Sequence, residues 1–340
     1  MWDVHHVIMD ASSRNILTRE IRQILEGARI KRETGAFSCS IYYPPETIWK
    51  SEEFFDGMLS GYDNESGLIS DISGSFGVSE KMLPCNPEQI TGFASSLGIT
   101  AGDLFIAAFA YTLSRFTGRS DSVFNITDTG RISSETAGSI GMFVRTLPLR
   151  IDCSDRKSSA FLKEVSSVHL DSMSNGIIPY GKLAKKYGVS LSVLFEYNAG
   201  INRAFQSESS SFEADAPSGS GIVSDIQCVI SDKEDGYCVS LFHSDKFSCG
   251  TAELMTDAYC RIVSGLIEKE NLSDIIYTSG NDVLRSESVN ANGKEIKYLD
   301  ILKAFADNVP LYRDRPLVSF KDISITYGEA DSITDGIAYR

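Results

Sequence analysis

The sequence lacks long hydrophobic runs. Nowhere in its 340 residues do roughly 18 apolar residues follow one another, which is the length that a membrane-spanning helix needs. The first residues also lack the basic segment and the apolar core of a secretory signal peptide. We therefore expect no membrane span, and we predict a soluble protein that works in the cytoplasm.

Basic residues are in short supply. The chain has 32 Lys and Arg against 46 Asp and Glu, which gives a net charge of -14. A surface of this sign repels the phosphate backbone of nucleic acids, so we expect no nucleic-acid partner. The remaining composition, with 42% hydrophobic and 23% charged residues, is that of an ordinary globular protein, and the length suffices for two domains.

Residues that bind metals are few and scattered. The seven cysteines form no Cys-x-x-Cys pair, and their odd number and wide spacing fit buried thiols in a reducing compartment. The four histidines are His5, His6, His169 and His243. Neighbouring side chains of a strand point to opposite faces, so His5 and His6 cannot easily bind one metal ion. We expect neither a metal site nor a disulfide.

Apolar periodicity and capping residues predict a mixture of helices and strands. Helices are expected at residues 12–27, 46–60, from 86 onward, and at 100–116, 158–173 and 251–267. Strands are expected at residues 2–9, 123–127, 142–151, 191–197, 222–230 and 237–243. Because the two kinds of element do not alternate strictly, the pattern indicates an α+β fold (α/β in two layers), with a mixed sheet and helices on one side.

Three of these helices have apolar faces that we expect to be buried. Ser12 or Ser13 caps the first, and its apolar face consists of Ile16, Leu17, Ile21, Ile24 and Leu25. The second is expected to bury Ile48, Trp49 and Phe55. The helix at residues 100–116 is apolar nearly all round, which predicts burial on several sides.

Polar stretches divide the chain. Residues 61–79 are rich in Gly and Ser and are typical of a boundary, and residues 198–221 are typical of a mobile surface loop. Residues 290–294 have the composition of a linker. A short helix is expected after them at residues 298–305, then strands at 318–320 and 323–327, and a final helical segment.

The double histidine near the start suggests acyl-transfer chemistry. An imidazole has a reference pKa of about 6.5 and can accept a proton near neutral pH, which suits transfer of an acyl group to an amine or alcohol. Asp10 follows His6 by four residues and can pair with an arginine. Two ordinary histidines beside a turn aspartate would give the same short pattern, so the motif needs support from the rest of the chain.

That support comes from a family resemblance. His5-His6-Val7-Ile8-Met9-Asp10 resembles the H-H-x-x-x-D-G signature of condensation domains of nonribosomal peptide synthetases. Ser13 matches the serine that trails this signature, whereas Ala11 stands in place of the glycine. If the turn requires a positive φ at this glycine, alanine costs roughly 1 kcal/mol.

Further segments resemble the same family in the same order. Gly118-Arg119-Ser120-Asp121 and Thr129-Gly130-Arg131 are similar to its G-x-x-D and G-R segments. Residues 140–150 are similar to I-G-x-F-V-N-T-x-x-x-R and supply Gly141, Phe143 and Arg150, with Arg145 at the asparagine. Residues 178–183 and 236–266 match more weakly, and the R-D-x-S-R-N-P motif is missing. Phe305 and residues 325–329 resemble the opening of an adenylation domain.

The resemblance implies a fold and a domain order. The fold would be a lobe similar to chloramphenicol acetyltransferase, with a remnant of the N-terminal lobe before it. Residues 1–78 would be that remnant, which carries the histidines, and residues 79–285 the C-terminal lobe. Residues 286–297 would be a linker, and 298–340 the start of an adenylation domain.

It also implies a reaction and roles for residues. A condensation domain joins an acyl or peptidyl thioester donor to an aminoacyl thioester acceptor, and carrier proteins present both on 4′-phosphopantetheine arms. No cofactor would bind the chain directly. His6 would be catalytic, with His5, Asp10 and Arg131 in support. Arg131 is the first choice as the partner of Asp10, and Arg150 the second. The structural motif would consist of Ala11, Ser13, Gly141, Phe143 and Arg150.

Several alternatives remain open on sequence alone. The chain could be a non-catalytic docking module for carrier proteins, which Ala11 and Arg145 favour, or a stand-alone acyltransferase. His6 could act as a general base or as a group that positions the amine. Because the resemblance begins inside the family domain, we expect residues 1–340 alone to be inactive.

Overall fold

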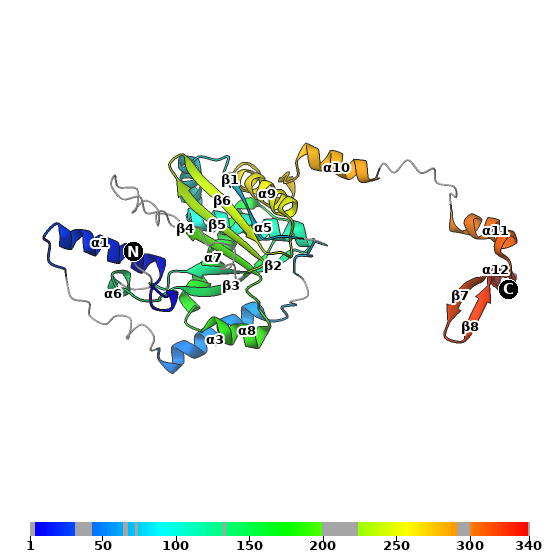
Figure 1. Ribbon diagram of the computed structural model, residues 1–340, viewed down its shortest axis with the longest axis horizontal. Coiled ribbons are helices and arrows are strands. Elements are labelled where there is room, and N and C mark those ends of the chain that lie inside the picture. Colours follow the sequence, from blue (N-terminus) through cyan, green and yellow to red (C-terminus); the bar gives the residue numbers. More distant parts are fainter. Residues whose placement is uncertain are drawn as a thin grey trace. The chain divides into compact units, whose positions relative to one another are not determined.

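The computed structural model describes residues 4–30, 43–63, 67–71, 74–131, 134–198, 224–290 and 300–338. The chain divides into two compact units, Met1–Ser279 and Gly280–Arg340, and each is described by itself (Figure 1). Within the described residues, no single helix is both long and apolar enough to cross a membrane.

A six-stranded mixed sheet forms the centre of the first unit (Figure 1). Its strands are β1 (Gly77–Met82), β2 (Asp121–Asp128), β3 (Arg145–Asp152), β4 (Val193–Asn198), β5 (Ile226–Lys233) and β6 (Gly236–His243). They lie in the order β1-β6-β5-β4-β2-β3, where β4 pairs in parallel with both β2 and β5 and the other pairs are antiparallel. The carboxyl ends of β2, β4 and β5 therefore meet at one edge of the sheet.

Three helices cover one face of this sheet: α5 (Ala101–Thr117), α7 (Ser158–Asn175) and α9 (Cys249–Glu268). The almost wholly apolar α5 is buried along most of its length, as its sequence predicts. A capping box of Thr100 and Asp103 starts it, and Gly118 in the left-handed region ends it. The predicted α+β fold with a mixed sheet and helices is confirmed.

A smaller apolar cluster joins α3 (Pro45–Leu59) to α8 (Tyr180–Tyr187). It contains the buried side chains of Phe55, Leu59, Ile178, Leu183 and Val189. Arg150 ties the end of α3 to the sheet, because its guanidinium donates to the carbonyl oxygen of Ser60 at 2.6 Å and binds both carboxylate oxygens of Asp121. Arg150 is therefore engaged with Asp121 and not with Asp10.

The strand predicted at residues 2–9 is wrong over its second half. His6–Ile8 form a short 3-10 helix, η1, in which the His5 Nδ1 accepts a hydrogen bond from the Val7 N–H at 3.1 Å. Residues 2 and 3 lie outside the described residues. A polar ring that can cap a turn locally outweighs the strand preference of the few apolar residues around it.

The first helix, α1 (Ala11–Leu25), is present, but two details differ from prediction. Asp10 caps it, not Ser12 or Ser13, and of the predicted apolar face only Ile16 is fully buried. Leu25 is 82% exposed, as is 66% of Trp49 in α3. Periodicity identifies an apolar face, but another element must be present to cover it.

The sequence does not predict several of the elements that form. These are β1, whose alternating exposed residues fit an edge strand, α8, the short helices α6 (Ser134–Ala137) and η4 (Leu272–Asp274), and α10 (Gly280–Asn290). The helix α4 (Pro87–Leu97) starts at Asn86 as predicted, with a complete capping box. The predicted loop at residues 198–221 lies almost wholly outside the described residues.

The second unit contains α10, α11 (Ile301–Tyr312), β7 (Pro316–Phe320), β8 (Ile323–Thr326) and α12 (Tyr327–Ala338). The predicted hairpin is present, while the helix expected at residues 298–305 continues to Tyr312. Residues 286–290 of the expected linker belong to α10, and residues 291–297 lie outside the described residues. The domain boundaries at 78, 285 and 297 remain predictions.

A buried carboxylate locks α5 to α7. Asp103 is 2% exposed and accepts hydrogen bonds from Thr100, from the Ser166 hydroxyl at 2.9 Å and from His169 Nδ1 at 2.7 Å. Burial alone would raise the pKa of Asp103, but these hydrogen bonds outweigh it and lower the pKa below its ordinary value. The carboxylate form is therefore the one that stabilises the fold.

This contact predicts a pH-dependent loss of stability in Asp103→Asn. The amide has one acceptor oxygen in place of two and cannot accept the bonds from Thr100, Ser166 and His169 together, so we expect the free energy of unfolding to fall by about 2 kcal/mol at pH 7. Because the folded pKa lies below the unfolded value of about 3.9, the loss should be complete above that pH and shrink below it. Urea denaturation followed by circular dichroism measures this, with the exposed Asp235→Asn as the control. A loss of the same size at pH 3 would contradict the role of the charge.

Candidate functional site

A buried ion pair joins the N-terminal segment to the edge of the sheet. Arg131 Nη2 lies 2.9 Å and 3.2 Å from the two carboxylate oxygens of Asp10, and the two side chains are 7% and 0% exposed. The structure thus contains the ion pair of Asp10 and Arg131, which the family resemblance gives as the first choice. Asp10 also accepts the backbone N–H groups of Ser13 at 2.7 Å and Phe143 at 3.1 Å. One carboxylate therefore caps α1 and holds the loop before β3.

Ser13 makes a second link between the same segments. Its hydroxyl donates to the carbonyl oxygen of Gly141 at 2.8 Å and accepts the Gly141 N–H at 3.0 Å. Arg131 Nη2 lies 2.8 Å from the same hydroxyl. Ser13 is fully buried, so these bonds stay away from competing water. Ser13, Gly141 and Phe143 are thus brought together around Asp10.

The position of Arg131 depends on the chain on both sides of it. Its Nη1 donates to the carbonyl oxygens of Thr136 and Ser139 at 2.6 Å and 2.7 Å, and its guanidinium lies 4.4 Å from the centre of the Phe143 ring. Gly130 before it has a φ of +65°, and a Cβ there would come within 2.0 Å of the Phe143 carbonyl oxygen. Only glycine fits this close approach of two backbones.

The electrostatics of Asp10 follow from these contacts. Burial alone would raise the pKa of Asp10, but hydrogen bonds from Ser13, Arg131 and Phe143 lower it below its ordinary value. Asp10 is therefore a carboxylate at neutral pH, and its charge stabilises the contacts with Arg131, Ser13 and Phe143.

The two histidines stand immediately before this anchor. The Nδ1 of His5 is occupied in capping η1, whereas His6 is exposed, and no hydrogen bond to its ring exists within the described residues. Of the two imidazoles, His6 is thus the one available to a substrate. His169 is bound to Asp103, and His243 is buried, with its Nδ1 3.2 Å from the Ser244 carbonyl oxygen.

The two departures from the family pattern cause no strain in the structure. Ala11 is the first residue of α1, and among the described residues only Lys321 combines a side chain with a positive φ. The alanine therefore avoids the cost expected for a left-handed turn. Arg145 forms an ion pair with Asp128 and donates to the carbonyl oxygens of Gly176 at 2.9 Å and Met173 at 3.2 Å. It binds the end of α7, where a cation is favourable.

Sequence reasoning missed one further group near His6. Glu196, on β4, is partly buried, and burial raises the pKa of its carboxyl above the ordinary value. A single charged residue inside an otherwise apolar strand was the signal that could have identified it.

No cluster of three or more His, Cys, Asp or Glu side chains in the described part of the chain could hold a metal ion. Four of the six described cysteines are buried, and all six are free. Burial raises the pKa of the Cys153 and Cys260 thiols to about 12, which makes them poor nucleophiles.

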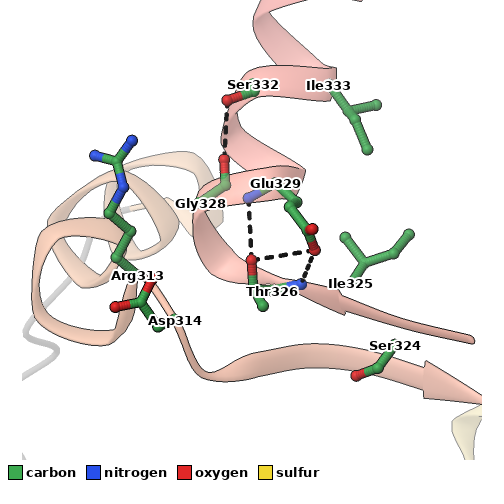
Figure 2. A pocket seen from close by; sticks show the side chains of 9 residues that line it. All are labelled: Arg313, Asp314, Ser324, Ile325, Thr326, Gly328, Glu329, Ser332 and Ile333. Carbon is green, nitrogen blue, oxygen red and sulfur yellow. Dashed lines mark hydrogen bonds between the residues drawn. The ribbon is translucent and has the colours of Figure 1, made fainter.

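Two of the pockets formed by the described residues lie elsewhere, and His6 lines neither of them. One of ≈410 Å³ lies between β1 and α9, beside the ion pair of Lys81 and Asp257. Figure 2 shows the other, of ≈720 Å³, in the second unit. There Thr326 N–H donates to Glu329 Oε2 at 2.9 Å, and the Glu329 N–H donates to Thr326 Oγ1 at 3.2 Å. These bonds cap α12, so the side chains of Thr326 and Glu329 both stabilise the start of this helix.

Comparison with known proteins gives a family match over most of the chain. The family model described as the condensation domain matches residues 1–274. Tyrocidine synthase 2 of Brevibacillus parabrevis is 24% identical over 204 residues, which are 56% of this chain and 6% of that protein. Bacitracin synthase 3 of Bacillus licheniformis is 26% identical over 203 residues, which are 56% of this chain and 3% of that protein. The chain thus spans only a small fraction of these relatives.

Solved structures show the same fold. The condensation domain of the monacolin K polyketide synthase has a TM-score of 0.60 at 16% identity, over 78% of this chain and 68% of that chain. A four-domain nonribosomal peptide synthetase bound to AMP and glycine has a TM-score of 0.67 at 15% identity, over 96% of this chain and 28% of that chain.

The buried ion pair predicts the effect of Arg131→Lys. Lysine cannot reach Asp10, Ser13 and the two carbonyl oxygens together, so we expect the N–H groups of Ser13 and Phe143 to exchange hydrogen about 10- to 100-fold faster. Residue-resolved hydrogen exchange measures this. Arg119→Lys, in an exposed pair with Asp63, is the matched control. Unchanged protection of both N–H groups in Arg131→Lys would contradict the anchoring role.

The close approach at Gly130 makes a second prediction. Gly130→Ala must displace the backbone of Phe143, so the free energy of unfolding should fall by about 3 kcal/mol or more. Gly118→Ala is the control, because Gly118 has a φ of +69° but open space around it. It should cost only the left-handed preference, about 1–2 kcal/mol. Equal losses in the two variants, measured by urea denaturation, would mean that the backbone contact is unimportant.

Proposed function

Because the chain belongs to the condensation-domain family, we propose that it forms amide bonds as part of a nonribosomal peptide synthetase. A donor acyl or peptidyl thioester and an acceptor aminoacyl thioester would arrive on the 4′-phosphopantetheine arms of carrier proteins. The amine nitrogen bonds to the donor carbonyl carbon, the C–S bond breaks, and the thiol leaves with a proton. The 4′-phosphopantetheine arms are parts of the donor and acceptor substrates.

The observation that carries this proposal is the anchor formed by Asp10 and Arg131. It holds the start of α1 rigidly, and His6 lies four residues before Asp10 with an exposed ring. An imidazole can take the proton of the attacking amine or hold that amine against the donor, and each role needs a defined position of the ring. Asp10 and Arg131 are then positioning residues, and His5 supports η1 through its own ring.

The second unit is proposed to begin an adenylation domain, with residues 298–340 as its start. The hairpin of β7 and β8 followed by the capped α12 carries the residues that resemble that domain. The four-domain synthetase, which aligns with 96% of this chain, supports the same order. A synthetase in which an adenylation domain follows the condensation domain argues against the alternative of a stand-alone acyltransferase. The free thiols of the described cysteines suit a reducing compartment, so we propose the cytoplasm as the place of action.

His6→Ala in the natural full-length protein tests the proposed catalytic role. Loss of a general base or of amine positioning should lower the rate of amide formation about 10²- to 10⁴-fold. The assay supplies donor and acceptor carrier proteins with their thioesters and measures the condensed product.

The control for His6→Ala is Arg19→Ala, an exposed change on α1 that should leave the rate unchanged. If His6→Ala also forms product at the normal rate, the catalytic role of His6 is wrong, and this result favours the alternative of a non-catalytic docking module for carrier proteins. The acceptor amine titrates in both proteins, so a further rise of the rate with pH that is present in the natural protein and lost in His6→Ala would identify His6 as a base.

A further inference from the structure

Glu196 emerges from the sheet on the face that α5 does not cover. Its neighbour Phe195 is 1% exposed, and the ring of Tyr197 packs against Phe105 with 5.3 Å between the ring centres. Both neighbours belong to the core beneath α5. Side chains alternate along a strand, so the carboxyl of Glu196 points to the opposite face.

The topology brings Glu196 and His6 to one edge. Because β2 and β4 are parallel, with Ile126 opposite Phe195, their carboxyl ends lie side by side (Figure 1). Just beyond the end of β2 stands Arg131, which holds Asp10 and with it the segment that carries His6. Glu196 lies near the end of β4. The two side chains thus reach the same edge from different parts of the chain.

The carboxyl of Glu196 has neutral hydrogen-bond partners. The side chains of Asn198 and Gln227 bind it, and no Lys or Arg of the described residues forms an ion pair with it. Burial raises the pKa of Glu196, and the hydrogen bonds oppose this rise. A partly buried carboxyl at the same edge as His6, with no Lys or Arg partner among the described residues, is suited to a cation from the substrate.

The acceptor of the proposed reaction carries such a cation. An α-amino group has a reference pKa of about 7.7–8.0, so most acceptor molecules enter the site as ammonium ions at neutral pH. We propose that Glu196 binds the ammonium group of the acceptor aminoacyl thioester and places its nitrogen beside His6, which rests on the proposed function. Of the three ammonium protons, one stays on the amide nitrogen, one ends on the departing thiol and one goes to solvent. Glu196 thereby selects amines over uncharged acceptors.

Binding of unreactive probes tests this without any turnover. The natural full-length protein is titrated with an alanyl-pantetheine analogue in which an amide replaces the thioester, and with its N-acetyl counterpart, which has no ammonium group. In Glu196→Gln, the dissociation constant for the amine probe should rise about 10- to 100-fold. The dissociation constant for the N-acetyl probe should stay unchanged. Unchanged binding of this probe would also show that the variant is folded.

Glu80→Gln is the matched control. Glu80 lies on β1 of the same sheet, is exposed, and accepts a hydrogen bond from the Ser240 hydroxyl at 2.6 Å. Glu80→Gln should bind both probes as the natural protein does. Three results would overturn the proposal: equal weakening of both probes in Glu196→Gln, unchanged binding of the amine probe, or no preference of the natural protein for the amine probe.

The result of the binding experiment with Glu196→Gln can be distinguished from the result of the activity experiment with His6→Ala. If His6→Ala condenses normally while Glu196→Gln loses only the amine probe, the catalytic role of His6 fails and the acceptor site at Glu196 stands. If His6→Ala is inactive and Glu196→Gln binds both probes normally, the proposed function stands and the role of Glu196 is wrong.

Discussion

The ion pair of Asp10 and Arg131 is the constraint on which the candidate site depends. Removing two charges from water costs several kcal/mol per ion, and only good geometry with further hydrogen bonds offsets this. Here Asp10 accepts two backbone N–H groups besides the guanidinium, and Arg131 donates to two carbonyl oxygens and a hydroxyl. Further hydrogen bonds therefore support the pair on both sides, and it ties together segments more than a hundred residues apart in sequence.

The anchor formed by Asp10 and Arg131 limits the size of the side chains that fit around it. Gly130 has no side chain because the backbone of Phe143 passes too close, and Ser13 is small enough to be buried between α1 and Gly141. His6, in contrast, lies exposed beside the anchor, and no side chain of the described residues forms a hydrogen bond with its ring. Rigid support with an available imidazole is the arrangement that proton transfer or substrate positioning requires.

The two departures from the family pattern show that local context decides the effect of a substitution. At position 11 the backbone is helical, so alanine fits as well as glycine. Arg145 does not project into open space, because Asp128 and the last carbonyl groups of α7 bind its guanidinium. Both substitutions are accommodated by the fold, and neither disturbs the contacts of Asp10.

The sequence by itself determined the fold class, the buried α5, the capped start of α4, the order of the motifs and Arg131 as the first choice for Asp10. The first three follow from periodicity and capping chemistry, which are local, whereas the choice of Arg131 is what the family resemblance implies. Tertiary structure alone decided that η1 replaces a strand, that Leu25 and Trp49 stay exposed, and that Glu196 shares an edge with His6. Such features depend on which element covers a face and on how parallel strands align, and no short stretch of sequence contains that information.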